Sequence, residues 1–408
     1  MKENKPDVVI MSSDWEPQPL SHFLRERKEK SDGVSEVHSV SVQYGVINQV
    51  DFLGRSYAAE DTSNYKLVYP YDVVYTKSPT GNYPYGIIKQ NQNTFKVIVS
   101  PLYGVFRPRN KYIGYIIQSY FESPNTITKY LAPIIAKGAK NTIQISNDLF
   151  LSRNVYLPCQ IEVQKKIAEF LSSIDKQIEQ QRKELEALKQ HKQALMQQLF
   201  PHIGNNKPRV RVVRSNQKWK VLHTEEVFIR VTERNNGQSD NVLTISAQFG
   251  LIKQQDFFDR TISNDIKDYY LIKKGDFTYN KSYSSQYPMG VIKPLKNYED
   301  GVVSPLYICF RVKDGFVHDF FEHYFESGLF NYEIRKIAQE GARNHGLLNV
   351  SVKDFFTKTK LLVPTLVEEQ ETIAKTLSSI NTIIEASEKK YELLKNHKRG
   401  LMQQLFPD

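Results

Sequence analysis

The chain has 408 residues, of which 25% are charged and 40% hydrophobic, and its formal net charge at neutral pH is +10. This composition excludes a disordered chain, and without a signal peptide or a run of about 18 apolar residues we expect a cytoplasmic protein with no membrane segment. The two cysteines, Cys159 and Cys309, are too few for a disulfide framework, so we expect buried free thiols.

Residues 1–157 predict a first globular domain of mixed α and β structure. Short runs rich in β-branched and aromatic residues, such as Val42–Ile47 and Phe95–Ser100, predict strands, and Tyr112–Ser123 predicts a helix. The motif VSPLY at Val99–Tyr103 predicts a turn at a strand end.

The loop from Tyr75 to Gly86 and the segment KGAKN at 137–141 present polar and basic side chains to solvent. Lysine suits guanine edges and phosphates, and asparagine suits adenine. The candidates for nucleic-acid contact in this half are Lys77, Asn82, Tyr83, Lys140 and Asn141. For each one, a solvated loop residue without a ligand is the alternative.

Residues 158–203 predict a long helix with one apolar seam. Apolar residues recur at alternating spacings of four and three, which is the pattern of a coiled coil. Gln181 and Lys192 interrupt the seam and would fix its register, and Pro201 ends the helix. The predicted seam residues are Ile167, Leu171, Ile174, Ile178, Leu185, Leu188 and Leu195.

The second half of the chain repeats the first. LMQQLFP ends at Pro201 and again at Pro407, and residues 158–201 are identical to residues 364–407 at 24 of 44 positions. A period of this length indicates two duplicated halves. We therefore predict a second globular domain at 204–363 and a second helix at 364–408. Its seam residues are Ile373, Leu377, Ile380, Ile384, Leu394 and Leu401, interrupted by Ser387 and Lys398.

The loop from Tyr279 to Gly290 and the segment EGARN at 340–344 correspond to the first-half loop and to KGAKN. The ends of the two loops match while their centres differ, which is typical of one scaffold with a variable reading surface. The second-half candidates for nucleic-acid contact are Lys281, Tyr283, Gln286, Arg343 and Asn344.

Two matching seams predict that the helices pack on each other as an antiparallel rod of about 55 Å, with the two globular domains at opposite ends. The fold class is α+β: two mixed domains separated by two coiled-coil helices, with an internal pseudo-twofold repeat. The alternative is that each helix packs as a core helix on its own domain.

The positive charge lies outside the helices. Residues 162–201 carry seven Lys/Arg against six Asp/Glu and residues 368–407 carry six of each, so +9 of the +10 belongs to the rest of the chain. A basic globular surface favours a polyanionic partner such as nucleic acid, although solubility alone could also explain it.

No catalytic or metal motif emerges from the sequence. HDFFEH at His318–His323 has the spacing of neither zincin pattern, so a pair of satisfied histidines is the better interpretation. We therefore expect a protein that is not an enzyme and binds neither metal nor cofactor.

Two dissimilar globular domains, each followed by a well-matched helix with LSSI at its centre and LMQQLFP at its end, resemble the specificity subunit of type I restriction-modification enzymes. The resemblance implies that each domain reads one half of a bipartite double-stranded DNA target and that the helices set the gap. It also implies two methyltransferase subunits that carry S-adenosylmethionine and methylate DNA, and two restriction/translocase subunits that use ATP and Mg.

A methyltransferase helix could pack on the flank of the first helix at Phe170, Ala187, Ala194 and Met196. Two other readings stay open at this point. One is a recognition module of another phage-defence or methylation system, including an orphan specificity cassette. The other is a coiled-coil adaptor without a role in DNA binding.

Overall fold

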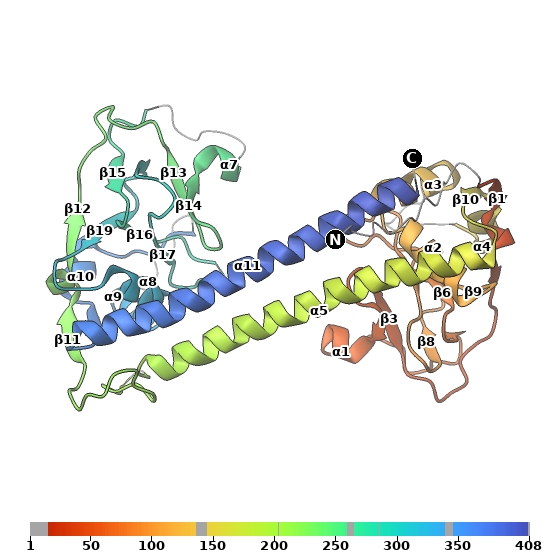
Figure 1. Cartoon of the computed structure of the whole chain (residues 1–408), viewed down its shortest axis with the longest axis horizontal. Helices are drawn as coiled ribbons and strands as arrows, with labels where there is room; N and C mark the ends of the chain where they lie inside the picture. Colours follow the sequence, from red (N-terminus) through yellow and green to blue (C-terminus); the bar gives the residue numbers. More distant parts are fainter. Residues whose placement is uncertain are drawn as a thin grey trace, which may run out of the picture. The chain divides into compact units, whose positions relative to one another are not determined.

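A computed structural model of the chain describes residues 15–135, 145–202, 204–258, 265–284, 286–338 and 346–406. These residues form two compact units, and the unit boundaries fall inside two 39-residue helices, α5 (Ile161–Leu199) and α11 (Val367–Leu405). Unit 1 contains residues 1–182 and 389–408, and unit 2 contains residues 183–388. Each unit therefore holds one globular domain and a segment of each long helix (Figure 1).

The globular domain of unit 1 is built on a four-stranded antiparallel sheet. Its strand order is β2 (Leu24–Glu26), β9 (Gly104–Pro108), β6 (Val73–Tyr75) and β7 (Ile88–Gln90). Three strand pairs add to it: β3 (His38–Ser41) with β4 (Gly45–Asn48), β5 (Lys66–Val68) with β8 (Val97–Val99), and β1 (Pro17–Pro19) with β10 (Asn154–Tyr156).

The helices of this domain begin at good capping residues. Asn110 accepts from the first amides of α2 (Lys111–Tyr120), and Ser123 caps α3 (Pro124–Leu131), which has proline in its first turn. The shorter helices are α1 (Gln49–Leu53) and α4 (Asn147–Ser152). Buried residues of the sheet, α2, α3 and α4 join Ile167 and Leu171 of α5 in one core.

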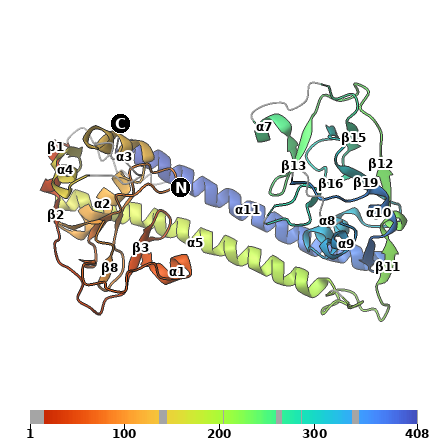
Figure 2. The ribbon, with the colours of Figure 1, turned by 180° about the vertical axis from the view of Figure 1, so that it is seen from behind.

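The globular domain of unit 2 has the same topology (Figure 2). Its four-stranded sheet has the order β12 (Phe228–Val231), β19 (Ile308–Val312), β16 (Phe277–Asn280), β17 (Val291–Pro294). The added pairs are β13 (Leu243–Ser246) with β14 (Gly250–Lys253), β15 (Tyr270–Lys273) with β18 (Asp300–Val303), and β11 (Lys220–His223) with β20 (Lys360–Val363). The helices are α6 (Thr224–Val227), α7 (Gln254–Phe258), α8 (His318–Glu326), α9 (Phe330–Ile337) and α10 (Val352–Thr357).

The two long helices run antiparallel within each unit. Lys398 of α11 lies 2.7 Å from Asp175 of α5 in unit 1, and Lys189 of α5 lies 2.6 Å from Glu388 of α11 in unit 2. All thirteen predicted seam residues are buried or half-buried. The coiled-coil interpretation is therefore confirmed, and the alternative of a helix that packs only on its own domain is wrong.

Each globular domain is completed by the C-terminal end of a long helix. Phe200, which follows α5, packs against Trp219, Phe320 and Tyr324 of unit 2, with ring centroids 5.6–6.3 Å apart. Phe406, which follows α11, packs in the same way against Trp15 and Tyr120 of unit 1, at 6.0 and 5.4 Å. The repeated LMQQLFP motif is thus a docking element.

An ion pair accompanies each docked helix end. Lys192 of α5 lies 2.5 Å from Glu326 in unit 2, and the equivalent Lys398 of α11 contacts Glu122 as well as Asp175 in unit 1. Lys398 is only 8% exposed, so its charge is stabilised by these carboxylates. The lysines that interrupt the two seams therefore bind the globular domains.

Some local predictions are confirmed and others are wrong. Strand β8, helix α2 and the turn in which Tyr103 donates to the Ser100 carbonyl at 3.1 Å occur as predicted. Val42–Ile47 is not one strand, because a turn before Gly45, whose φ is +67°, separates β3 from β4. Cys309 is buried as expected, but the expectation is wrong for Cys159, which is exposed just before α5. Met196, expected on the flank of the first helix, is instead buried in the core of unit 2.

Candidate nucleic-acid interface

The predicted reading loop of unit 1 connects β6 to β7 and is held at both ends. The buried Tyr75 hydroxyl donates to the Tyr85 carbonyl at 2.8 Å, and Gly86, with φ +84°, packs closely against Thr76. Thr80 and Tyr83 pair through two backbone hydrogen bonds and leave Asn82 exposed at the tip. The Tyr83 hydroxyl donates to the Glu122 carbonyl at 2.7 Å, so that ring supports the loop.

Lys77 is the one cation between Tyr75 and Gly86, and its surroundings perturb it. Its backbone has φ +53°, and its half-buried ammonium donates to the Ile145 carbonyl at 2.9 Å. Burial and the nearby charge of Lys66 lower the pKa of Lys77 to about 8, although Glu26 opposes the shift. Near neutral pH the side chain therefore carries a weakly hydrated positive charge with donor capacity to spare.

The corresponding loop of unit 2 connects β16 to β17 on the same supports but takes a different course. The Tyr279 hydroxyl donates to the Met289 carbonyl at 2.9 Å, as Tyr75 does in unit 1. A β-bridge joins Ser282 to Leu347, and the Tyr283 amide donates to the Gly346 carbonyl. Tyr283 and Gln286 are exposed.

Each predicted loop contacts a residue that follows the second predicted segment of its half. Lys77 reaches Ile145, the first described residue after the KGAKN segment. The carbonyl of Lys281 accepts from Leu348, shortly after the EGARN segment, and burial lowers the pKa of the Lys281 ammonium. Lys140, Asn141, Arg343 and Asn344 lie outside the described residues.

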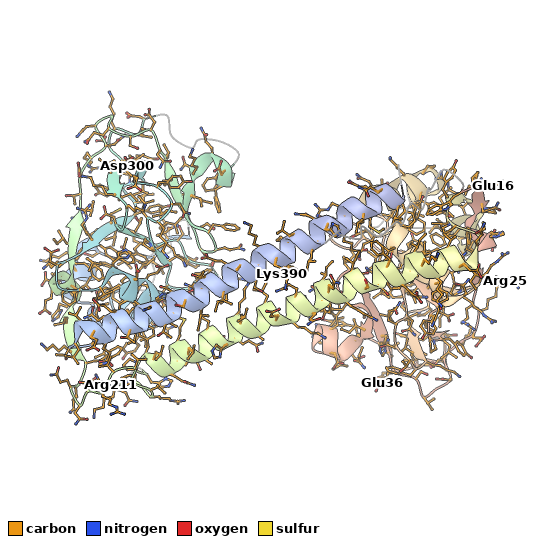
Figure 3. The ribbon with its side chains drawn as sticks, in the orientation of Figure 1. Glu16, Arg25, Glu36, Arg211, Asp300 and Lys390 are labelled. Atoms are coloured by element: carbon orange, nitrogen blue, oxygen red, sulfur yellow. The ribbon has the colours of Figure 1, made fainter. Side chains whose placement is uncertain are left out.

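A basic segment between α5 and β11 was missed by the sequence reasoning. Residues 204–220 hold six Lys/Arg and no Asp/Glu, a charge run that counting in a short window would have found. Arg211, which is labelled in Figure 3, is tied to the buried Glu369, with Nε 2.9 Å from the carboxylate. The exposed cations are Lys207, Arg209, Arg214, Lys218 and Lys220.

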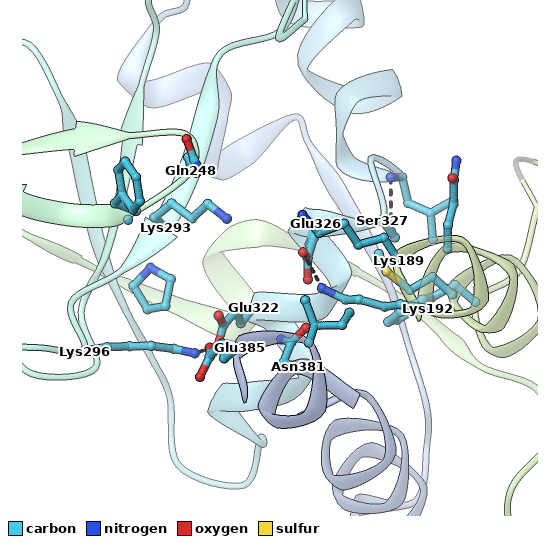
Figure 4. Close-up of a pocket in the computed structure, with 18 of the residues that line it drawn as sticks. Lys189, Lys192, Gln248, Lys293, Lys296, Glu322, Glu326, Ser327, Asn381 and Glu385 are labelled. Atoms are coloured by element: carbon cyan, nitrogen blue, oxygen red, sulfur yellow. Dashed lines mark hydrogen bonds and ion pairs between the residues drawn. The ribbon is translucent and has the colours of Figure 1, made fainter. Parts of the chain in front are cut away.

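A cleft of about 840 Å³ in unit 2 lies between the globular domain and the two helix segments (Figure 4). Lys296 pairs with Glu322 at 2.6 Å across its floor, beside the Lys192–Glu326 pair. Phe249, in the turn between β13 and β14, forms part of its rim with 63% of its surface exposed. The cleft has lysines and carboxylates in similar number, which suits a protein surface better than a polyanion.

The histidines of HDFFEH both have partners in α8 or nearby. His323 is fully buried between Ser378 and Glu326, and His318 lies 2.9 Å from the Gly275 carbonyl. Within the described ranges, no group of three or more His, Cys, Asp or Glu could hold a metal ion. Among the same residues, no helix has the length and apolar character needed to cross a bilayer.

Comparisons with known proteins give one family model and solved structures of the same fold. Residues 39–190 match the family model Methylase_S, the type I restriction modification DNA specificity domain. The fold matches a type I restriction-modification system S subunit from M. genitalium with TM-score 0.59 and 11% identity, covering 97% of this chain and 96% of that one. A structure from work on complex assembly and conformational transition of the type I R-M system matches with TM-score 0.50 and 14% identity, over 96% and 97%. No curated protein matches.

Proposed function

We propose that this chain, which carries a type I restriction modification DNA specificity domain and has the fold of a solved S subunit, is the subunit that selects the DNA sequence in such a complex. Each globular domain reads one half of a bipartite target. The helices α5 and α11 set the gap between the halves. Catalysis belongs to partner subunits.

The observation that carries this proposal is the pairing of one scaffold with two different loops. Both units hold the loop ends with a buried tyrosine hydroxyl and a glycine at positive φ, whereas the exposed side chains between them differ. Two copies of one domain with different surfaces suit an asymmetric target. Lys77 and Lys281 would contact phosphates or guanine, and Asn82, Tyr283 and Gln286 would contact base edges.

The basic segment 204–220 would add affinity without sequence preference. Its five exposed cations have the character of phosphate contacts, which release counterions and make binding fall with salt. We expect charge-neutral variants of these residues to weaken binding to all DNA sequences alike. Variants of Gln286 should instead change which base is preferred.

The helices also supply a surface for partners. Phe170, Ala187 and Ala194 are exposed on α5, and Leu393 is 59% exposed on α11. Two methyltransferase subunits, each with S-adenosylmethionine, would dock beside the helices, and restriction/translocase subunits would join through that complex. The double variant Ala187→Asp/Leu393→Asp should prevent methyltransferase assembly and leave the fold unchanged.

The test is methylome sequencing of cells that express this chain with its methyltransferase subunit, compared with cells that lack the chain. A new bipartite adenine-methylation motif is the expected result. Replacing residues 1–157 by the corresponding domain of another specificity subunit should change one half of the motif only. An assembled complex that methylates no new motif would reduce the chain to an adaptor.

A further inference from the structure

One surface segment is shared by the two globular domains although their reading loops differ. Residues 43–52 (QYGVINQVDF) and 248–257 (QFGLIKQQDF) are identical at six of ten positions. Each covers the turn and second strand of a hairpin, β3–β4 or β13–β14, and the helix that follows, α1 or α7. Another segment that the two globular domains share is VSPLY, at 99–103 and 303–307.

Folding explains only part of the shared segment. Gly45 and Gly250 have φ of +67° and +74° in the hairpin turns, where other residues would be strained. Val46 and Leu251 are buried in the small hairpin cores. The aromatic residues are not explained in this way, because they point to solvent.

The exposed apolar side chains form one hairpin patch in each unit. In unit 1 the patch comprises Tyr44, Val50, Phe52 and Leu53, which are 38–50% exposed. In unit 2 it comprises Phe249, Phe257 and Phe258, which are 42–63% exposed. In unit 1 the Tyr44 and Phe52 rings are in contact, with centroids 6.2 Å apart, and in unit 2 the adjacent Phe257 and Phe258 rings lie 4.7 Å apart. Clustered exposed aromatic residues are typical of a protein interface.

Both hairpin patches adjoin the helix pair at equivalent places. The guanidinium of Arg182, on α5, lies 5.4 Å from the centre of the Tyr44 ring. Phe249 shares the rim of the unit 2 cleft with Glu388 of α11, the residue that corresponds to Arg182 in the repeat. The unit 1 patch therefore contacts α5 at Tyr44, and the unit 2 patch borders at Phe249 a cleft that α11 also lines.

We infer that the hairpin patches are docking sites for one partner protein that binds twice, the methyltransferase subunit, one copy on each unit. This inference rests on the proposed function. Two domains that read different half-sites share only the DNA backbone, which charged side chains bind better than apolar rings do, and they also share the enzyme that each must present to DNA. A surface retained in both halves therefore fits the common partner, and the variable loops fit the DNA.

The test measures methyltransferase stoichiometry by native mass spectrometry of the full complex. Tyr44→Ser/Phe52→Ser should remove one copy, Phe249→Ser/Phe257→Ser the other copy, and the combined variant both, with each site weakened about ten-fold or more. Phe52→Asp and Phe257→Asp provide second variants. Phe95→Ser and Tyr332→Ser, which alter exposed aromatic residues without an aromatic counterpart in the other half, are the matched controls and should retain two copies.

Two further measurements separate the possible outcomes. DNA affinity of the chain alone, measured by fluorescence anisotropy on its methylated motif, should not change in the patch variants, and thermal unfolding should match the wild type. Loss of DNA affinity with two copies retained would assign the patches to DNA and overturn the inference. Loss of self-association of the isolated chain would assign them to a second copy. A wild-type chain that binds no methyltransferase would refute the proposed function itself.

Discussion

Removing the aromatic ring at a docked helix end should destabilise one unit more than the other. Phe200 is 2% exposed and touches three aromatic rings, whereas Phe406 is half-buried and touches two. A buried Phe→Ala substitution costs about 3–5 kcal/mol, since it removes apolar contacts and leaves a cavity. For Phe406→Ala we expect about 1–2 kcal/mol, because part of the ring already faces water.

The two tryptophans make this difference measurable. Trp219 lies beside Phe200 in unit 2 and Trp15 beside Phe406 in unit 1, so a Trp15→Phe or Trp219→Phe background reports one unit at a time. With a urea slope of about 2 kcal/mol per M, Phe200→Ala should lower the unit 2 midpoint by about 2 M. Phe406→Ala should lower the unit 1 midpoint by less than about 1 M.

The control is Phe95→Ala, which alters a ring that is 55% exposed and should change stability by less than about 0.5 kcal/mol. Equal midpoint shifts for Phe200→Ala and Phe406→Ala, or a larger shift for Phe406→Ala, would refute the reasoning. The burial of each ring at its helix end would then not determine how strongly that end stabilises its unit.

Three further predictions concern charge and backbone. Burial alone would raise the pKa of Glu326, but the hydrogen bond with His323 and nearby lysines lower it to about 2. Because this pKa lies below the unfolded value, unit 2 should lose stability as pH falls from about 5 to about 2, and Glu326→Gln should make its urea midpoint less pH-dependent. The pKa of Lys77 is lowered to about 8, so the side chain loses its charge between pH 7 and 9. The DNA affinity of the wild type should therefore fall over this range, whereas that of Lys77→Met should stay constant. A flat wild-type profile in anisotropy titrations would argue against a Lys77 contact. Gly290 has a φ of +75°, and a Cβ there would lie 2.3 Å from the Asn280 carbonyl oxygen. Gly290→Ala should therefore lower the free energy of unfolding by more than about 1 kcal/mol, measured by calorimetry, and impair recognition of one half-site only.

The long helices were predictable because their energetics follow a short local period. Leu171 and Leu377 are fully buried, as their heptad positions predict. Because the same pattern occurs in both halves of the sequence, each helix supported the prediction of the other. The polar seam positions were recognised but their role was not. Lys398 contacts Glu122, which lies 276 residues earlier in the chain, and a local sequence pattern cannot predict a contact over that separation.

The loop residues were predictable as a surface but not as individual contacts. Asn82 and Gln286 are exposed as expected, whereas Tyr83 uses its hydroxyl to hold the Glu122 carbonyl. From the sequence, a tyrosine that supports a polar loop cannot be told from one that contacts a base. The shared hairpin segment was visible in the alignment of the halves, but only the structure separates its buried residues from its exposed aromatic ones.

Unit 1 is formed by two separate segments of the chain, and this affects its folding during synthesis on the ribosome. Its globular domain and its part of α5 emerge first, yet the segment of α11 that completes it begins only at Lys389, after the 206 residues of unit 2 that follow Arg182. At about 5–20 residues per second, the surface that receives Phe406 stays uncovered for about 10–40 s. Unit 2 is continuous in sequence and needs no later segment. The domain that is made first is therefore the last to be completed, and chaperone binding to nascent chains should be concentrated on Trp15 and Tyr120 during that interval.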